Sequence, residues 1–111
     1  MQGDVKGCLR KYGGIYMLHS TLINSTPCWT DKSKTNSIWF EITNGYWIVG
    51  TTSNLGKNIG ALIGPECEDW PHNVSSGWKY HDGKKWADAG GDLVFEALSN
   101  GKSYKINPIS L

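Results

Sequence analysis

The sequence predicts a small all-β domain, an antiparallel sandwich or barrel built from hairpins with tight turns and with little or no helix. Three turn dipeptides lie between runs of aromatic and aliphatic residues: Asn44-Gly45, Asp82-Gly83 and Asn100-Gly101. Asn-Gly and Asp-Gly tolerate positive φ at both central positions, so they fit the type I′ turn that joins antiparallel strands. No stretch of ten or more residues has apolar side chains at helical spacing.

The length of 111 residues is typical of one domain, so we expect a single all-β domain over residues 1–111. The charge is nearly balanced, with 11 basic and 10 acidic residues. A nucleic-acid-binding protein usually has a clear basic excess, so we expect no nucleic-acid partner. No apolar run approaches the ~18 residues that a membrane span requires, so we expect no span.

The first half of the chain predicts four strands. Ile15–His19 is an apolar run that predicts the first, and Pro27–Trp29 opens a second, short one. The segment Asp31–Asn36 has no apolar residue and predicts an exposed loop. The third and fourth strands, Ser37–Thr43 and Tyr46–Thr51, flank Asn44-Gly45.

A two-residue turn in this first hairpin would pair Ile42 with Trp47, Phe40 with Val49 and Trp39 with Gly50. Side chains alternate between the faces of a strand, so the pairing divides the hairpin into two faces. One face is uniformly apolar and is expected to pack on the core: Ile38, Phe40, Ile42, Trp47 and Val49. The other mixes large aromatic with polar side chains: Trp39, Glu41, Thr43, Tyr46 and Ile48.

The second half predicts two more hairpins. The glycine-rich stretch Thr51–Gly64 is expected to hold a loop and one buried strand, and Pro65–Ser76 is expected to be irregular. Gly77–Ala87 surrounds Asp82-Gly83 and predicts the second hairpin. The third hairpin joins the strands Leu93–Leu98 and Lys102–Ile106, with Phe95 opposite Ile106 and Ala97 opposite Tyr104.

No catalytic or cofactor-binding motif is present, so we expect neither an enzyme nor a cofactor. The segment from Pro65 to His72 combines the thiol of Cys67, three carboxylates (Glu66, Glu68 and Asp69) and an imidazole. A structural zinc site needs four ligands and a calcium loop alternates oxygen ligands with a glycine turn, and neither pattern fits. We expect an exposed acidic loop and no metal site.

The three cysteines, Cys8, Cys28 and Cys67, form an odd set, which is unlike a disulfide-rich scaffold. Two states are compatible with this count: three reduced thiols, or one disulfide with one free thiol. The N-terminal residues lack the apolar stretch of a signal peptide, and these features together favour an intracellular location slightly.

Six tryptophans are difficult to bury completely in so small a domain, so we expect three or four in the core and two or three at the surface. The candidate ligand-binding residues lie on or near the mixed hairpin faces: Trp39, Tyr46, Tyr80 and Trp86. Exposed aromatic rings beside polar groups stack on sugar rings, and they equally anchor peptides. The sequence therefore predicts a non-catalytic binding module for a glycan or small polar ligand, with a protein-interaction domain as the alternative.

Scattered positions also carry a resemblance to a known group of domains: Gly14-x-Tyr16, Asn24-x-x-Pro27-x-Trp29, Ile38-Trp39-Phe40, Trp47-Ile48 and Gly77-Trp78. In this order they resemble a small tryptophan-rich domain that occurs, often in tandem, in large multidomain eukaryotic proteins. The resemblance implies a non-catalytic module and identifies no site residue. The chain departs from that domain in Thr51–Gly64 and in the acidic loop after Pro65.

Substitution of Gly45 or Gly83 by valine is expected to destabilise the fold, because a β-branched residue adopts positive φ only at a cost. Thermal unfolding of Gly45→Val and Gly83→Val measures this effect. Melting temperatures equal to that of the parent chain would contradict the expected turn conformation.

Overall fold

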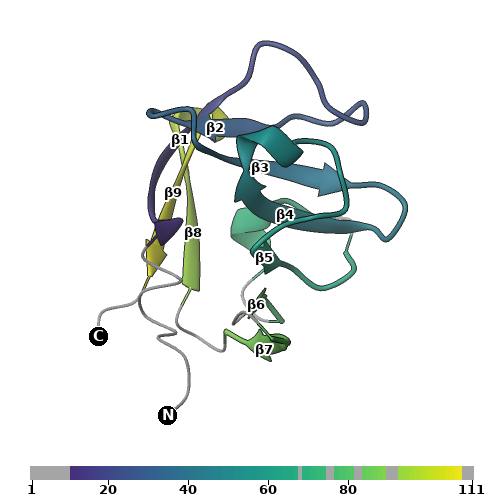
Figure 1. Cartoon of the computed structure of the whole chain (residues 1–111). Helices are drawn as coiled ribbons and strands as arrows, with labels where there is room; N and C mark the ends of the chain where they lie inside the picture. Colours follow the sequence, from purple (N-terminus) through teal and green to yellow (C-terminus); the bar gives the residue numbers. More distant parts are fainter. Residues whose placement is uncertain (1–10, 68, 75–76, 82–83, 90–92, 109–111) are drawn as a thin grey trace.

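One antiparallel sheet of nine strands, in the order β7-β6-β5-β4-β3-β2-β1-β9-β8, makes up the fold. The structure is a computed structural model that describes residues 11–67, 69–74, 77–81, 84–89 and 93–108. The sheet curls into a half-barrel with β8 and β9 standing across from β4, β5 and β6 (Figure 1). This confirms the predicted all-β class and its antiparallel hairpins. The second predicted turn, Asp82-Gly83, lies outside the described residues.

The strands are short, and consecutive strands are neighbours except β7 and β8, which lie at opposite ends of the strand order; β9 pairs with both β8 and β1. In chain order they are β1 (Gly14–Leu18), β2 (Trp29–Asp31), β3 (Asn36–Glu41), β4 (Tyr46–Thr51), β5 (Leu62–Ile63), β6 (Lys79–His81), β7 (Trp86–Asp88), β8 (Leu93–Leu98) and β9 (Ser103–Pro108). Three short 3-10 turns lie between them: η1 (Thr52–Asn54), η2 (Pro71–Asn73) and η3 (Ser99–Gly101). No helix among the described residues is long and apolar enough to cross a membrane.

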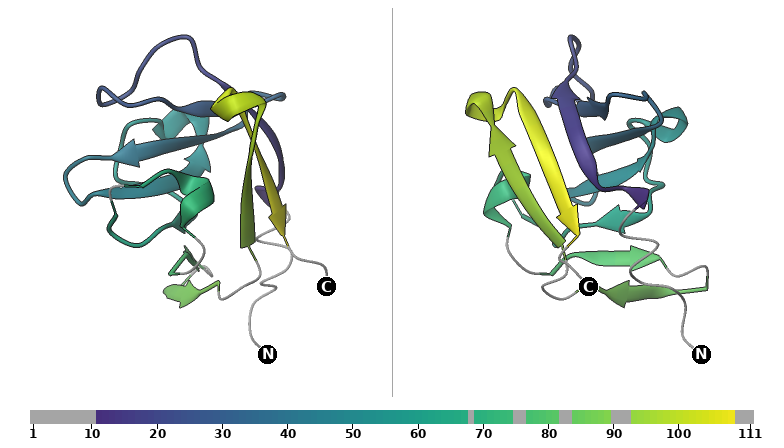
Figure 2. Two further views of the ribbon diagram at one scale, coloured as in Figure 1. Left: turned by 180° about the vertical axis from the view of Figure 1, so that it is seen from behind. Right: turned by 90° about the vertical axis from the view of Figure 1, so that its left-hand side faces the viewer.

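Aromatic rings fill the concave side of the half-barrel. Trp78, directly before β6, stacks on Phe95 of β8 with ring centroids 4.3 Å apart and an angle of 22° between the planes. This contact joins the two parts of the curled sheet, the β8–β9 hairpin and the strands β4–β6. These two parts approach each other in the rear and side views (Figure 2). The main core consists of buried residues from both of these parts and from the strands that connect them: Tyr12, Tyr16, Trp29, Ile38, Trp47, Val49, Leu62, Trp78, Tyr80, Ala89, Phe95, Tyr104 and Ile106.

The third hairpin has the predicted register and the predicted turn. Phe95 lies opposite Ile106 and Ala97 opposite Tyr104. Asn100 (φ 58°) and Gly101 (φ 85°) both have positive φ, as a type I′ turn requires. The backbone N–H of Lys102 donates to the carbonyl of Ser99 across the turn (3.2 Å).

The first hairpin is shifted by two residues from the predicted register. Phe40 lies opposite Trp47 and Glu41 opposite Tyr46, which leaves a four-residue loop, 42–45. Gly45 alone in this loop has positive φ (74°), so the predicted type I′ turn is wrong here. The two predicted faces persist because a shift of two residues conserves side-chain alternation. Ile42, however, lies in the loop and is 58% exposed, not in the core.

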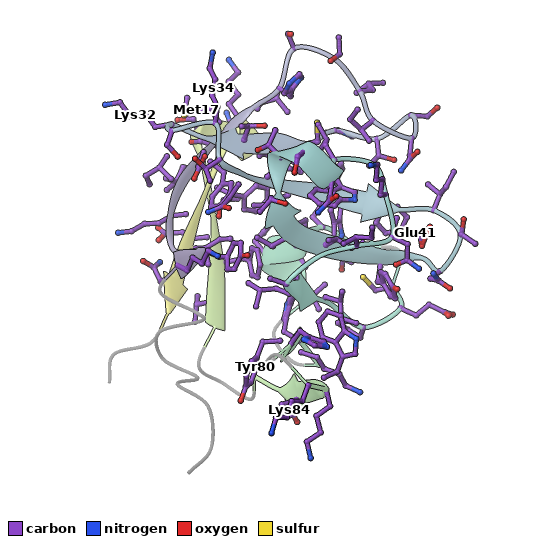
Figure 3. All side chains as sticks on the ribbon, in the orientation of Figure 1. Met17, Lys32, Lys34, Glu41, Tyr80 and Lys84 are labelled. Carbon is purple, nitrogen blue, oxygen red and sulfur yellow. The ribbon has the colours of Figure 1, made fainter. Side chains whose placement is uncertain are left out.

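The carboxylate of Glu41 stabilises this longer loop (Figure 3). Its two oxygens accept hydrogen bonds from the backbone N–H groups of Thr43 (2.9 Å) and Asn44 (2.8 Å). The side-chain amide of Asn44 donates a third (2.9 Å). Burial raises the pKa of the Glu41 carboxyl, but these hydrogen bonds outweigh burial and lower it below its usual value.

Both faces of the first hairpin are buried, which contradicts the expectation of a partly exposed second face. The glycine-rich segment between β4 and β5 folds back over that face and is held by a hydrogen bond from Ala61 N to Val49 O (2.9 Å). It encloses a second, smaller core that contains Cys28, Trp39 and Ile48. Close backbone approach makes this possible, since a Cβ on Gly50 would lie only 2.9 Å from Gly60 Cα.

Gly60→Ala should lower the free energy of unfolding by about 1–3 kcal/mol, the usual cost of overpacking. Its new Cβ would collide with Cγ2 of Ile48, under the folded-back segment. Urea unfolding of this variant beside Lys57→Ala, which removes an exposed side chain from the same segment, isolates the packing effect. Equal stability of the two variants would show that the segment does not pack closely on the hairpin at Ile48.

Glu41→Gln should lower the free energy of unfolding by about 1–2 kcal/mol at neutral pH, because charged hydrogen bonds in the loop are weakened. The pKa of Glu41 is lower in the folded chain, so the stabilisation is complete above the unfolded value of about 4.3 and is lost as the pH falls through the folded value. The stability difference between parent and variant should therefore shrink in acid. Glu96→Gln on the exposed face of β8 serves as the control, and a difference that is independent of pH would contradict the role of the Glu41 charge.

Candidate functional site

The tryptophans divide into four buried and two exposed rings, as the composition predicted. Trp29, Trp39, Trp47 and Trp78 are at most 3% exposed, whereas Trp70 is 45% and Trp86 40% exposed. The two exposed rings are far apart in the sequence and come from different elements, a loop and the edge strand β7.

The four predicted site residues do not form one site. Trp39 is completely buried in the second core, and its indole N–H donates to the carbonyl of Lys57 (3.0 Å), so its predicted exposure is wrong. Tyr46 is half-buried beside it, and its hydroxyl donates to Oδ1 of Asn58 (2.8 Å). Both belong to the layer beneath the folded-back segment.

The other two predicted residues lie on the β6–β7 hairpin. Tyr80 points into the main core and is only 7% exposed, which again contradicts the prediction. Trp86 is exposed as expected and packs edge-on against His81, its cross-strand partner, with centroids 5.1 Å apart. Trp86 is therefore a surface ring on β7, and it lines none of the hollows described below.

A different tryptophan, Trp70, borders a cleft of about 580 Å³, which we call the Trp70 cleft. Its floor consists of Trp29 and Tyr104, which are nearly buried and meet edge to face with centroids 4.7 Å apart. Leu18, Pro27 and Ala97 also line the cleft, together with Gly101 and the exposed polar residues His72, Asn100 and Lys102. The cleft is thus an aromatic hollow with a polar rim, the usual form of a small-ligand site.

Hydrogen bonds hold Trp70 in place from both sides. Its backbone N–H donates to Oδ1 of Asp69 (2.7 Å), and its carbonyl accepts from the backbone N–H of Asn73 (3.0 Å). The side-chain amide of Asn73 also donates to Oδ1 of Asp69 (2.7 Å). The next residue, Pro71, is buried and begins η2. Trp70 is therefore presented to solvent on a constrained backbone.

The two ionisable groups on either side of Trp70 differ in their environment. The side chain of Asn73 and the backbone N–H of Trp70 lower the pKa of Asp69, which is therefore a carboxylate at neutral pH. Burial raises the pKa of Tyr104 to about 12, so its hydroxyl stays protonated. That hydroxyl shares a hydrogen bond of 2.6 Å with Nδ1 of His72.

A second hollow of about 290 Å³, the Phe40 hollow, lies on the other side of Trp70. Three aromatic rings, Phe40, Trp47 and Trp70, line it together with Thr26 and Asp69. Phe40 and Trp47 are cross-strand partners with centroids 5.1 Å apart, and Trp47 and Trp70 are 6.1 Å apart. Trp70 borders both spaces.

The thiol and the imidazole of the segment from Pro65 to His72 lie at different spaces. Cys67 lines a third hollow beside Thr43 and Gly45, whereas His72 lines the Trp70 cleft. Cys28 and Cys67 are both free thiols, and Cys8 and Glu68 lie outside the described residues. In the described part of the chain, no three His, Cys, Asp or Glu side chains gather where they could hold a metal ion.

The sequence contained a signal for Trp70 that the prediction did not use. Trp70 lies between Asp69 and Pro71 in a segment without strand alternation, so no sheet face was available to bury it. The predicted sites were instead placed on hairpin faces, where pairing with a neighbouring layer buries large rings. A tryptophan in an irregular, proline-flanked loop was the better candidate for exposure.

Comparisons of the chain with protein-family models, with curated proteins and with solved structures find no match. The proposals below therefore rest on the geometry of the described residues.

Proposed function

We propose that this chain is a non-catalytic binding module that holds a sugar ring against the indole of Trp70. The observation that carries the proposal is a half-exposed tryptophan on a constrained backbone at the border of an aromatic cleft. A planar indole offers a broad apolar surface that matches the C–H face of a pyranose, while the sugar hydroxyls need polar partners. A non-catalytic module is also what the resemblance to tryptophan-rich domains implies.

Polar residues that line the cleft offer hydrogen-bond partners for those hydroxyls. Asn100 offers an amide that both donates and accepts, and Lys102 offers an ammonium donor. Both belong to the turn between β8 and β9, whose backbone is anchored to the floor because the indole N–H of Trp29 donates to Gly101 O (2.8 Å). A rim attached to a rigid floor loses little conformational entropy on binding.

The chemistry of the cleft also favours binding over reaction. In the described part of the chain, the side chain of His72 hydrogen-bonds to Tyr104, and no Ser, Thr or Cys nucleophile is bonded to it. The phenol of Tyr104 is held protonated by burial, which makes it a poor base at neutral pH. An acid–base–nucleophile set, the minimum for covalent catalysis, is not assembled there.

A free strand edge favours protein interaction as the second candidate function. Among the described strands, β8 pairs only with β9 and forms one end of the sheet, and apolar side chains on the outer face of this region are exposed. Val94 of β8 and Ile15 and Met17 of β1 are each at least 41% exposed. An added strand would protect the outward backbone amides of β8 from hydrogen exchange, which a sugar at Trp70 would leave unchanged.

Titration of intrinsic tryptophan fluorescence with a panel of mono- and oligosaccharides tests the sugar proposal. At least one sugar should shift the emission at millimolar concentration, and Trp70→Ala should weaken its binding by at least about tenfold, or ~1.4 kcal/mol. Calorimetry confirms the affinity where the removal of Trp70 changes the fluorescence signal. Trp86→Ala is the matched control, because it removes the other exposed tryptophan. If no sugar binds, or if both variants bind it as the parent does, the proposal fails.

A further inference from the structure

We propose that the Phe40 hollow is a binding site for a quaternary or methylated ammonium group. The proposal is independent of sugar binding in the neighbouring cleft. It starts from the composition of the hollow, in which three aromatic rings and one carboxylate are four of the five described side chains in the lining. None of these five residues carries a positive charge.

Three aromatic rings line the hollow. Trp47 is nearly buried, whereas Phe40 and Trp70 are partly exposed. The planes of Phe40 and Trp47 meet at 67°, and those of Trp47 and Trp70 at 31°. Aromatic faces carry negative electrostatic potential, so a cation surrounded by several rings is attracted from several directions.

Asp69 adds a full negative charge to this lining. Its Oδ1 accepts from the backbone of Trp70 and the side chain of Asn73, which fixes the carboxylate next to the rings. No described residue donates to its Oδ2, so this oxygen keeps its capacity to face a ligand cation. The backbone carbonyl of Asp69 is held as well, because it accepts from the indole N–H of Trp47 (2.7 Å).

The scarcity of free hydrogen-bond acceptors selects the methylated form of the cation. A primary ammonium needs about three acceptors when it leaves water. Among the described side chains of the lining, the acceptors left are the hydroxyl oxygen of Thr26, whose hydrogen goes to the carbonyl of Asn24 (3.2 Å), and Oδ2 of Asp69, because Oδ1 already accepts two hydrogen bonds. Each methyl group on the ammonium removes one N–H that needs an acceptor, and a quaternary ammonium needs none, only apolar contact and a compensating charge. The volume of about 290 Å³ suits a small headgroup and lies at the lower end of ligand pockets.

Choline and its neutral isostere 3,3-dimethyl-1-butanol provide the sharpest test, because they have the same shape and differ in charge. Choline should quench or shift tryptophan fluorescence with millimolar affinity, and the neutral isostere should bind at least about fivefold more weakly. Equal binding of the two compounds, or no binding of either, overturns the proposal. Separate titrations with Nε-trimethyllysine and with phosphocholine show whether the trimethylammonium group binds more tightly on a lysine side chain or on a phosphate ester.

Two variants locate the site. Phe40→Leu keeps an apolar side chain but removes a ring, so it should weaken choline binding at least about threefold and leave the neutral isostere unchanged. Asp69→Asn keeps Oδ1 as an acceptor, removes the charge, and should have the same selective effect. Thermal unfolding verifies that each variant folds, and Phe40→Leu decides the question if Asp69→Asn disturbs the loop. Trp86→Leu, at the remote exposed ring, should bind choline like the parent, and a loss there would also overturn the proposal.

Discussion

The packing and hydrogen bonding of the Trp29 indole in the core is the interaction on which the rest of the structure depends. β2 is an interior strand of the sheet, between β3 and β1, and Trp29 projects from it into the concave side. Its ring contacts Trp47, Trp70 and Tyr104, with centroids 5.8, 6.5 and 4.7 Å away. Its N–H binds the carbonyl of Gly101 in the distant β8–β9 turn. On the concave side of the curled sheet, this side chain links β2 to β4, to the loop before η2 and to the β8–β9 hairpin.

The candidate site is the outer rim of that same aromatic core. Trp70 contacts Trp29 and Trp47 with one part of its ring and reaches solvent with the rest. Asp69 and Asn73 fix the backbone around it, so the ring is positioned before any ligand arrives. Rigidity of this kind lowers the entropy that binding must overcome. Trp70 also borders two spaces with different linings. The Trp70 cleft has polar residues at its rim, and the Phe40 hollow contains the carboxylate of Asp69.

Local sequence was sufficient for the third hairpin and insufficient for the first, although both contain Asn-Gly. In the third, Asn100 and Gly101 both adopt the left-handed conformation that the dipeptide favours. In the first, the carboxylate of Glu41 binds two backbone amides of the loop and stabilises a four-residue connection instead. A side chain adjacent to the turn thus changed the register by two residues. Turn propensity is a local preference, and a competing set of hydrogen bonds overrides it.

The sequence by itself determined the all-β class, the positions of the hairpins and the presence of two or three tryptophans at the surface, because these follow from turn chemistry, alternation and volume. It did not determine which tryptophans are exposed. Trp39 was predicted to be exposed on a mixed hairpin face, but the segment around Gly60 covers that face and buries it. Trp70 is exposed although it lies in a loop, where the sequence defines no inner or outer face. Exposure depends on what covers a residue from elsewhere in the chain, and only the tertiary structure decided that.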